Sequence, residues 1–211
     1  ETLSATDMFN GTSMSAPSVS GVAALVMSAA KQNGMKPRPA LMRNALMLGA
    51  TPITEEAVFT TGAGMANVTG AWEKLQLLKD EPAFDVFWDR AVTGGSFVDS
   101  GRGLYLRESV GERRRQVRAI VSPFWPESSS NDERYRFEED LVLRAADAWV
   151  DAPSYMHVAN EKHYLTVQMD IPEMTEREHQ QGGLITSRVD ALVAGKEELG
   201  TVFSLPITIV R

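Results

Sequence analysis

The spacing of apolar residues changes along this chain of 211 residues, and that change limits the folds open to it. Up to about residue 80 the apolar residues recur every three or four positions, which is the period of an α-helix with one buried face. From Leu104 onward they alternate with polar residues, which is the period of a half-buried β-strand. The sequence therefore predicts a helical segment over residues 1–80, a connector over 81–103 and a β domain over 104–211.

Three helices are predicted in the first segment. The first follows Gly11-Thr12-Ser13 and keeps Pro17 in its first turn, where the missing N–H of a proline is not needed. The second is expected over residues 39–48, where a proline begins the apolar pattern and a glycine follows it. The third is expected over residues 68–78, with the side chain of Asn67 as its N-cap.

The second part of the chain is predicted to form short strands. Apolar and polar residues alternate over four stretches, 137–145, 164–169, 189–193 and 203–209. Turn-forming residues separate these stretches, a pattern typical of an antiparallel β-sandwich. The connector before them contains Pro82 and several glycines between positions 94 and 103, which are typical of a linker.

Composition excludes several classes of site. The chain has no cysteine, so it has no disulfide, no thiolate zinc site and no cysteine nucleophile. Its 3 histidines leave little material for a metal centre, and its net charge of −7 disfavours general binding to nucleic acid. The longest nearly apolar run, residues 19–30, is shorter than the roughly 20 residues that a bilayer span needs. We therefore expect no metal, no cofactor, no nucleic acid and no membrane segment.

The residues that indicate chemistry lie in the stretch Gly11-Thr12-Ser13-Met14-Ser15-Ala16-Pro17. This stretch places the hydroxyl of Ser13 at the start of a long helix, where backbone N–H groups are unpaired and the helix dipole favours negative charge. A serine there can attack a carbonyl while its own N–H stabilises the oxyanion that forms. Gly11 permits the sharp turn into the helix because it has no Cβ. A plain N-cap serine is the alternative interpretation of Ser13.

The stretch from Gly11 to Gly21 resembles the nucleophile segment of the subtilisin-like serine proteases, the subtilases. A second stretch, residues 62–72 (GAGMANVTGAW), is similar to the one that closes many subtilase catalytic domains. The resemblance implies a fold in which the helical C-terminal part of an α/β catalytic domain precedes the β-sandwich. It also implies that Ser13 is the nucleophile and a backbone oxyanion donor, supported in the motif by Gly11, Thr12, Met14, Ala16 and Pro17.

Later motifs are typical of one branch of the subtilases. Their order is similar to that in the region after the catalytic domain of the tripeptidyl peptidase II subfamily: 102–107, 123–126, 148–153 and 203–208. The resemblance implies a tripeptidyl aminopeptidase that acts on oligopeptides through an acyl-enzyme on Ser13. It also implies a large homo-oligomer. A cytoplasmic location is the matching expectation, and the absence of cysteine is compatible with it.

The family places an aspartate and a histidine of the catalytic triad before the serine, and the 12 residues that precede Ser13 match neither motif. We therefore expect the remainder of the catalytic domain to be a partner of this chain, and the 211-residue piece to be inactive alone. The start at Glu1 favours a piece of a longer protein. Five nearby or candidate residues are expected to lie outside the triad: Asp7, Asn10, His157, His163 and His179.

Two alternatives stay open from the sequence. The chain could derive from a degenerate subtilase that serves as a non-catalytic structural or binding module. A basic run, Arg113-Arg114-Arg115 with Arg118, could bind an acid or a phosphate, although a solvated edge strand or turn is the simpler interpretation.

Overall fold

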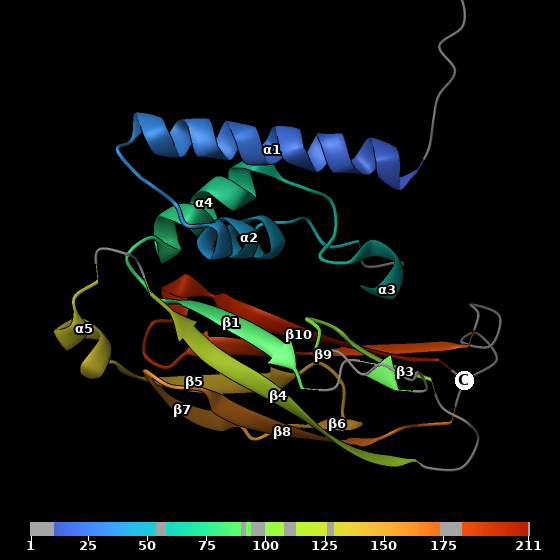
Figure 1. Ribbon diagram of the computed structural model, residues 1–211. Helices are drawn as coiled ribbons and strands as arrows, with labels where there is room; N and C mark the ends of the chain where they lie inside the picture. The colour runs from blue at the N-terminus through green and yellow to red at the C-terminus, as the bar shows by residue number, and fades with distance from the viewer. Residues whose placement is uncertain are drawn as a thin grey trace, which may run out of the picture.

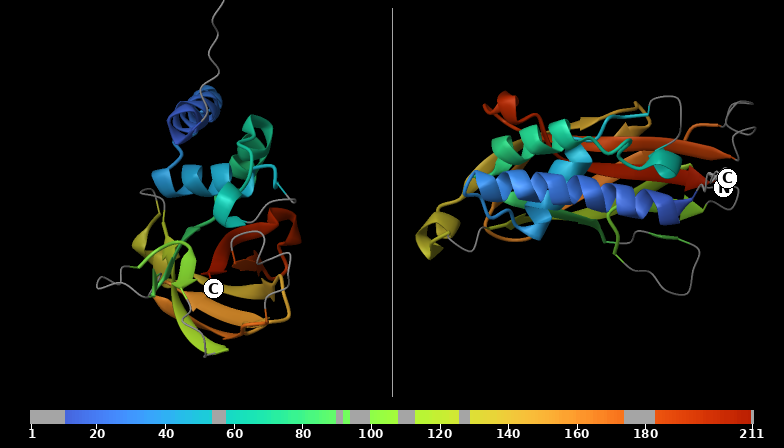
Figure 2. Two further views of the ribbon diagram at one scale, coloured as in Figure 1. Left: turned by 90° about the vertical axis from the view of Figure 1, so that its right-hand side faces the viewer. Right: turned by 90° about the horizontal axis from the view of Figure 1, so that it is seen from above.

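The structure, a computed structural model, describes residues 11–53, 58–89, 92–93, 100–107, 113–125, 129–173 and 183–210. Its helices are α1 (Thr12–Gln32), α2 (Pro39–Leu48), α3 (Val58–Thr61), α4 (Val68–Leu78), α5 (Asn131–Tyr135) and the short 3₁₀ turn η1 (Glu197–Leu199). Its strands are β1 (Ala83–Trp88), β2 (Val92–Thr93), β3 (Leu104–Arg107), β4 (Arg114–Phe124), β5 (Glu138–Ala145), β6 (Val150–Asp151), β7 (Tyr155–Ala159), β8 (His163–Asp170), β9 (Leu184–Val193) and β10 (Thr201–Val210). Helices α1, α2 and α4 lie on one side of the sheets, with α1 farthest from them (Figures 1 and 2).

Helix α1 begins at Thr12, earlier than the position of Pro17 predicts. Pro17 therefore lies in the second turn, where its ring nitrogen has no hydrogen to donate to the carbonyl of Ser13. Two serines in the same part of the helix, at positions 18 and 20, donate their hydroxyls to the carbonyls four residues earlier at 2.9 Å. The expected first-turn position of Pro17 is thus wrong, because the exposed end of a long helix can lose one backbone hydrogen bond and continue.

Helices α2 and α4 have the predicted limits. Pro39 starts α2, and the side-chain oxygen of Asn67 caps α4 by accepting a hydrogen bond from the N–H of Gly70 at 3.0 Å. The two helices meet at glycines, because a Cβ on Gly70 would lie 2.2 Å from the carbonyl oxygen of Gly49. The close approach of their backbones therefore requires that position 70 has no side chain.

Two sheets make up the sandwich. One has four strands in the order β1-β4-β8-β6, and the other has six in the order β2-β3-β10-β9-β5-β7. Most neighbours pair antiparallel, as expected, but β3 pairs parallel with both β2 and β10. The four stretches of alternating residues correspond to β5, β8, β9 and β10, which confirms those strand predictions.

The segment predicted to be a connector takes part in the sandwich. Residues 83–88 form β1, which pairs antiparallel with β4 along its whole length. Phe84, Val86 and Trp88 of this strand are at most 5% exposed. The alternation of apolar and polar residues in this strand is short. It lies between Pro82 and the glycines from position 94 onward, which are typical of a linker, so the sequence predicts no strand there. The division into domains at residues 80 and 104 stays a prediction.

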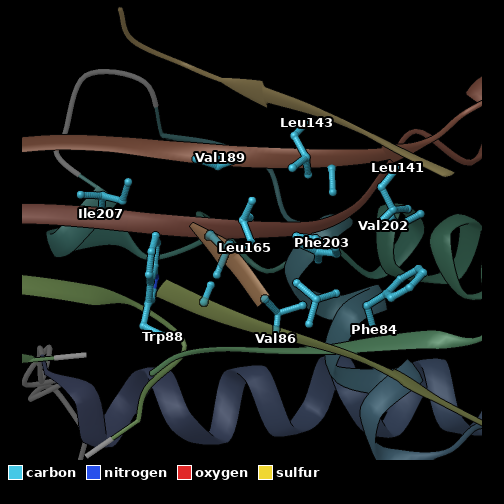
Figure 3. Packing of buried hydrophobic residues seen from close by; sticks show 14 of the residues in the cluster. Phe84, Val86, Trp88, Leu141, Leu143, Leu165, Val189, Val202, Phe203 and Ile207 are labelled. Carbon is cyan, nitrogen blue, oxygen red and sulfur yellow. The ribbon is translucent and has the colours of Figure 1, made fainter. Parts of the chain in front are cut away.

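One hydrophobic core joins the helices to the sandwich. Apolar side chains from β1, β5, β8, β9 and β10 fill the space between the two sheets (Figure 3). The rings of Phe84 and Phe203 meet edge to face, with 5.8 Å between their centroids. The same cluster continues into Ala45 of α2 and Leu75 of α4, both fully buried. Continuous apolar contact of this kind holds the helices against the sandwich.

Helix α1 is buried over a small part of its surface. Val26 and Ala30 are fully buried, whereas Met14, Val19 and Leu25 are 47%, 42% and 60% exposed. By length and composition alone α1 could span a bilayer, because the mean hydropathy of an 18-residue window within it is 1.3. Only 11% of that window is buried inside the structure. The core helix of a water-soluble domain meets the same criterion. The expected absence of a membrane segment therefore stays a prediction.

Candidate functional site

Ser13 occupies the second position of α1, at a helix end that no side chain caps. The N-cap is Gly11, with φ 148° and ψ 174°, and it has no side chain that could accept the first N–H groups of the helix. The space around Gly11 is open, so a larger residue would be disfavoured there by the φ angle rather than by contact. Ser13 is exposed, and among the residues that the structure describes its hydroxyl has no hydrogen-bond partner.

This arrangement suits a nucleophile. The uncapped N–H groups of α1 form the positive end of the helix dipole. A carbonyl attacked by Ser13 Oγ becomes an oxyanion, and the N–H of Ser13 can donate a hydrogen bond to it. The neighbouring Ser15 instead turns its hydroxyl back to the carbonyl of Gly11, at 3.4 Å. Of the two serines in the motif, Ser13 is therefore the one whose hydroxyl is available to an approaching substrate.

The second motif ties the end of α2 to the start of α4. The backbones of Thr51 and Met65 exchange two hydrogen bonds, of 2.9 and 2.8 Å. Gly64 has a φ of 114°, and a Cβ there would lie 2.2 Å from the carbonyl oxygen of Thr51. Asn67 donates to the hydroxyl of Thr51 at 3.1 Å while its oxygen caps α4. This motif thus has a structural role, since it fixes α4, against which α1 packs.

The two histidines within the described residues lie in the sandwich, away from α1 (Figure 1). His157 is on β7, and its Nδ1 is 2.9 Å from Asp140 Oδ1 on β5. His163 begins β8, and its Nε2 accepts the N–H of Ala159 at 2.8 Å across the β7–β8 turn. Both side chains have partners inside the sandwich and take no part in the surroundings of Ser13. Three other residues weighed from the sequence, Asp7, Asn10 and His179, lie outside the described residues.

The pair formed by His157 and Asp140 predicts a pH dependence. The hydrogen bond to Asp140 raises the pKa of His157, and the hydrogen bond to His157 lowers the pKa of Asp140. The pair therefore stabilises the folded chain most between about pH 4 and pH 6.5, the ordinary pKa values of the two groups. This contribution is lost as the pH rises through the raised pKa of His157 or falls through the lowered pKa of Asp140.

In the variant Asp140→Asn the pKa of His157 should fall towards its ordinary value, because the hydrogen-bonded carboxylate is gone. NMR titration of the imidazole ring protons measures this shift. The variant Asp151→Asn removes an exposed acid from β6 and should leave the pKa of His157 unchanged. If Asp140→Asn also left it unchanged, the proposed pairing would be wrong.

The basic run has acidic partners within the sandwich. The run lies at the N-terminal end of β4, where β4 pairs with β8. The pairing of β4 with β1 covers only positions 119 to 124. Opposite charges at this short range balance one another, which favours a structural role for the run over an anion site. The pairs are Arg113 with Glu173, Arg114 with Asp170 and Arg118 with Asp89.

Comparison with known proteins matches both parts of the chain. Residues 91–210 match the family described as tripeptidyl-peptidase II, first Ig-like domain, and residues 1–71 match the subtilase family. Tripeptidyl-peptidase 2 of Arabidopsis thaliana is 33% identical over 209 residues, which are 96% of this chain and 15% of that protein. Tripeptidyl-peptidase 2 of Oryza sativa subsp. japonica is 31% identical over 216 residues, covering 100% of this chain and 15% of that protein.

A solved structure has the same fold. The crystal structure of tripeptidyl peptidase 2 superposes with a TM-score of 0.73 and 25% sequence identity, over 96% of this chain and 16% of that chain. The chain thus spans about 15% of the length of the curated relatives that it matches. The subtilase match covers the Ser13 motif, and the Ig-like match covers nearly all of the sandwich. This chain belongs to the tripeptidyl-peptidase II family of subtilisin-like serine proteases.

Proposed function

We propose that this chain is part of a subtilisin-like serine peptidase whose nucleophile is Ser13. The observation that carries the proposal is the exposed hydroxyl at the uncapped start of α1, inside a motif that matches the subtilase family. Ser13 Oγ attacks the scissile carbonyl, and the leaving amine departs as an acyl-enzyme forms. The N–H of Ser13 stabilises the oxyanion, and water then releases the acyl group.

The base that accepts the proton of Ser13 belongs, in this proposal, to the larger part of the protein outside these 211 residues. The two described histidines have partners inside the sandwich. Met14, Val19 and Leu25 leave apolar surface of α1 exposed, which the rest of the catalytic domain would cover. Because loss of one triad member costs orders of magnitude in rate, we expect the 211-residue chain to be inactive alone.

The proposed substrate is an oligopeptide with a free N-terminus, from which a tripeptide is released. Release of a tripeptide is proposed from the names of the two plant relatives, both called tripeptidyl-peptidase 2, and the free N-terminus from the aminopeptidase action that the family resemblance implies. The large homo-oligomer and the cytoplasmic location stay predictions.

Covalent labelling of the full-length protein tests the nucleophile. A fluorophosphonate should attach to Ser13, located by mass spectrometry of the labelled peptide, whereas the 211-residue chain should take up no label. An oligopeptide with a free N-terminus should yield a tripeptide, and the same peptide with an acetylated N-terminus should not. Labelling at another serine would show that Ser13 is not the nucleophile, and labelling at none would favour the non-catalytic module.

A further inference from the structure

The turn between β9 and β10 forms polar contacts with α4 and with the segment just after it. Lys196, in the turn between β9 and β10, has its Nζ 2.9 Å from Glu81 Oε2, just after α4, and 2.7 Å from Glu139 Oε1 on β5. Lys74, near the middle of α4, donates from Nζ to the carbonyl oxygen of Leu199 in the same turn, at 2.7 Å. These five residues, Lys74, Glu81, Glu139, Lys196 and Leu199, are called the α4 clamp below.

The clamp is partly shielded from water. The side chains of Lys196, Glu81 and Glu139 are 35%, 28% and 17% exposed. Burial on its own lowers the pKa of Lys196, but hydrogen bonds to Glu139 and Glu81 raise it overall, so the ammonium stays charged. Lys74 lies in the middle of α4, and Glu81 lies three residues past its last residue, Leu78. Attachment at two separated points constrains both the position of α4 and its tilt.

Helix α4 in turn supports α1. The two helices pack together, and the fully buried residues of α1, Val26 and Ala30, lie in its second half. Ser13 lies 13 residues before Val26, which is about 20 Å along the helix axis. Over that length a tilt of about 3° moves Ser13 by about 1 Å. A shift of about 1 Å at a reacting group can cost about 100-fold in rate.

We infer that the α4 clamp is a positioning device, through which the sandwich keeps Ser13 aligned with the rest of the catalytic site. Lys196 is the positioning residue, since it bridges the end of α4 to β5. Without its cation, the carboxylates of Glu81 and Glu139 face each other, and their repulsion displaces the end of α4 relative to β5. The inference rests on the proposed function of Ser13.

The experiment compares variants of the full-length protein. Lys196→Met should lower kcat about 10-fold or more and leave KM within about twofold, because alignment is lost while substrate binding is kept. Lys196→Arg keeps the cation and should restore most of kcat. Glu81→Gln removes the ion pair between Lys196 and the segment after α4 without leaving two carboxylates facing each other. It is the alternative test variant if Lys196→Met fails to fold. Lys79→Met removes a lysine that pairs with Asp80, whose side chain is 84% exposed, and it is the matched control.

Hydrogen–deuterium exchange gives a second readout that does not depend on activity. Amides of α1 and α4 should exchange faster in Lys196→Met and Glu81→Gln than in the parent, and those of β5 and β9 should not. Folded variants with parental kcat, or with unchanged exchange in α1, would overturn the inference. A parent protein without Ser13-dependent labelling would instead overturn the proposed function, so the two failures are distinguishable.

Discussion

Replacing Ser13 by alanine in the full-length protein should lower kcat for peptide hydrolysis by about 10⁶-fold, the loss that removal of the nucleophile causes in subtilisin. Alanine has no oxygen that could form the acyl-enzyme, although the backbone N–H at position 13 remains. Steady-state hydrolysis of an oligopeptide measures the loss, and fluorophosphonate labelling should disappear with it. The fold should be unaffected, because Ser13 is exposed.

Ser18→Ala is the control for this experiment. The hydroxyl of Ser18 is directed back to the carbonyl of Met14, so its removal changes the helix and not the attacking group. That variant should keep nearly all of the parental activity. A Ser13→Ala protein that still hydrolysed peptides at the parental rate would show that another residue is the nucleophile.

Alanine at two helical glycines should change stability in opposite directions. Gly70→Ala in α4 should lower the free energy of unfolding by about 2–3 kcal/mol, because overpacking costs exceed the gain in helix propensity. The added Cβ would lie 2.2 Å from the carbonyl oxygen of Gly49, and backbone at that distance cannot yield without moving α2. Urea unfolding of the 211-residue chain, followed by circular dichroism, measures the change.

Gly21→Ala in α1 is the matched control. A Cβ at this position meets nothing within 4 Å, so the variant should gain about 0.5–1 kcal/mol from helix propensity alone. A Gly70→Ala chain as stable as the parent would mean that α2 and α4 are not in backbone contact.

Local signals account for the parts of the fold that were predicted. The limits of α2 and α4 follow from Pro39, Gly49 and Asn67, whose effects act within a few residues. Strands β5, β8, β9 and β10 follow from alternation over at least five positions. The expectation that Pro17 lies in the first turn of α1 was wrong because the usual rule for proline does not allow for a helix end that loses one hydrogen bond.

Long-range packing decided what local signals could not show. Strand β3 pairs with β10 about a hundred residues later, from Leu104 with Ile207 onward, and nothing near Leu104 indicates that partner. Strand β1 was missed because its few alternating residues lie beside linker-like sequence, and its pairing with β4 becomes visible only when the sheet is assembled.

The sequence by itself determined the family resemblance and the candidate nucleophile, because the residues from Gly11 to Pro17 are contiguous and their chemistry depends on one helix end. Only the tertiary structure showed that the sandwich holds α4 through Lys196 and Lys74. Those contacts join groups 57 to 125 residues apart in the chain. Charged side chains carry no sequence signal of their distant partners, so the attachment of α4 to the sandwich could be recognised only in the folded molecule.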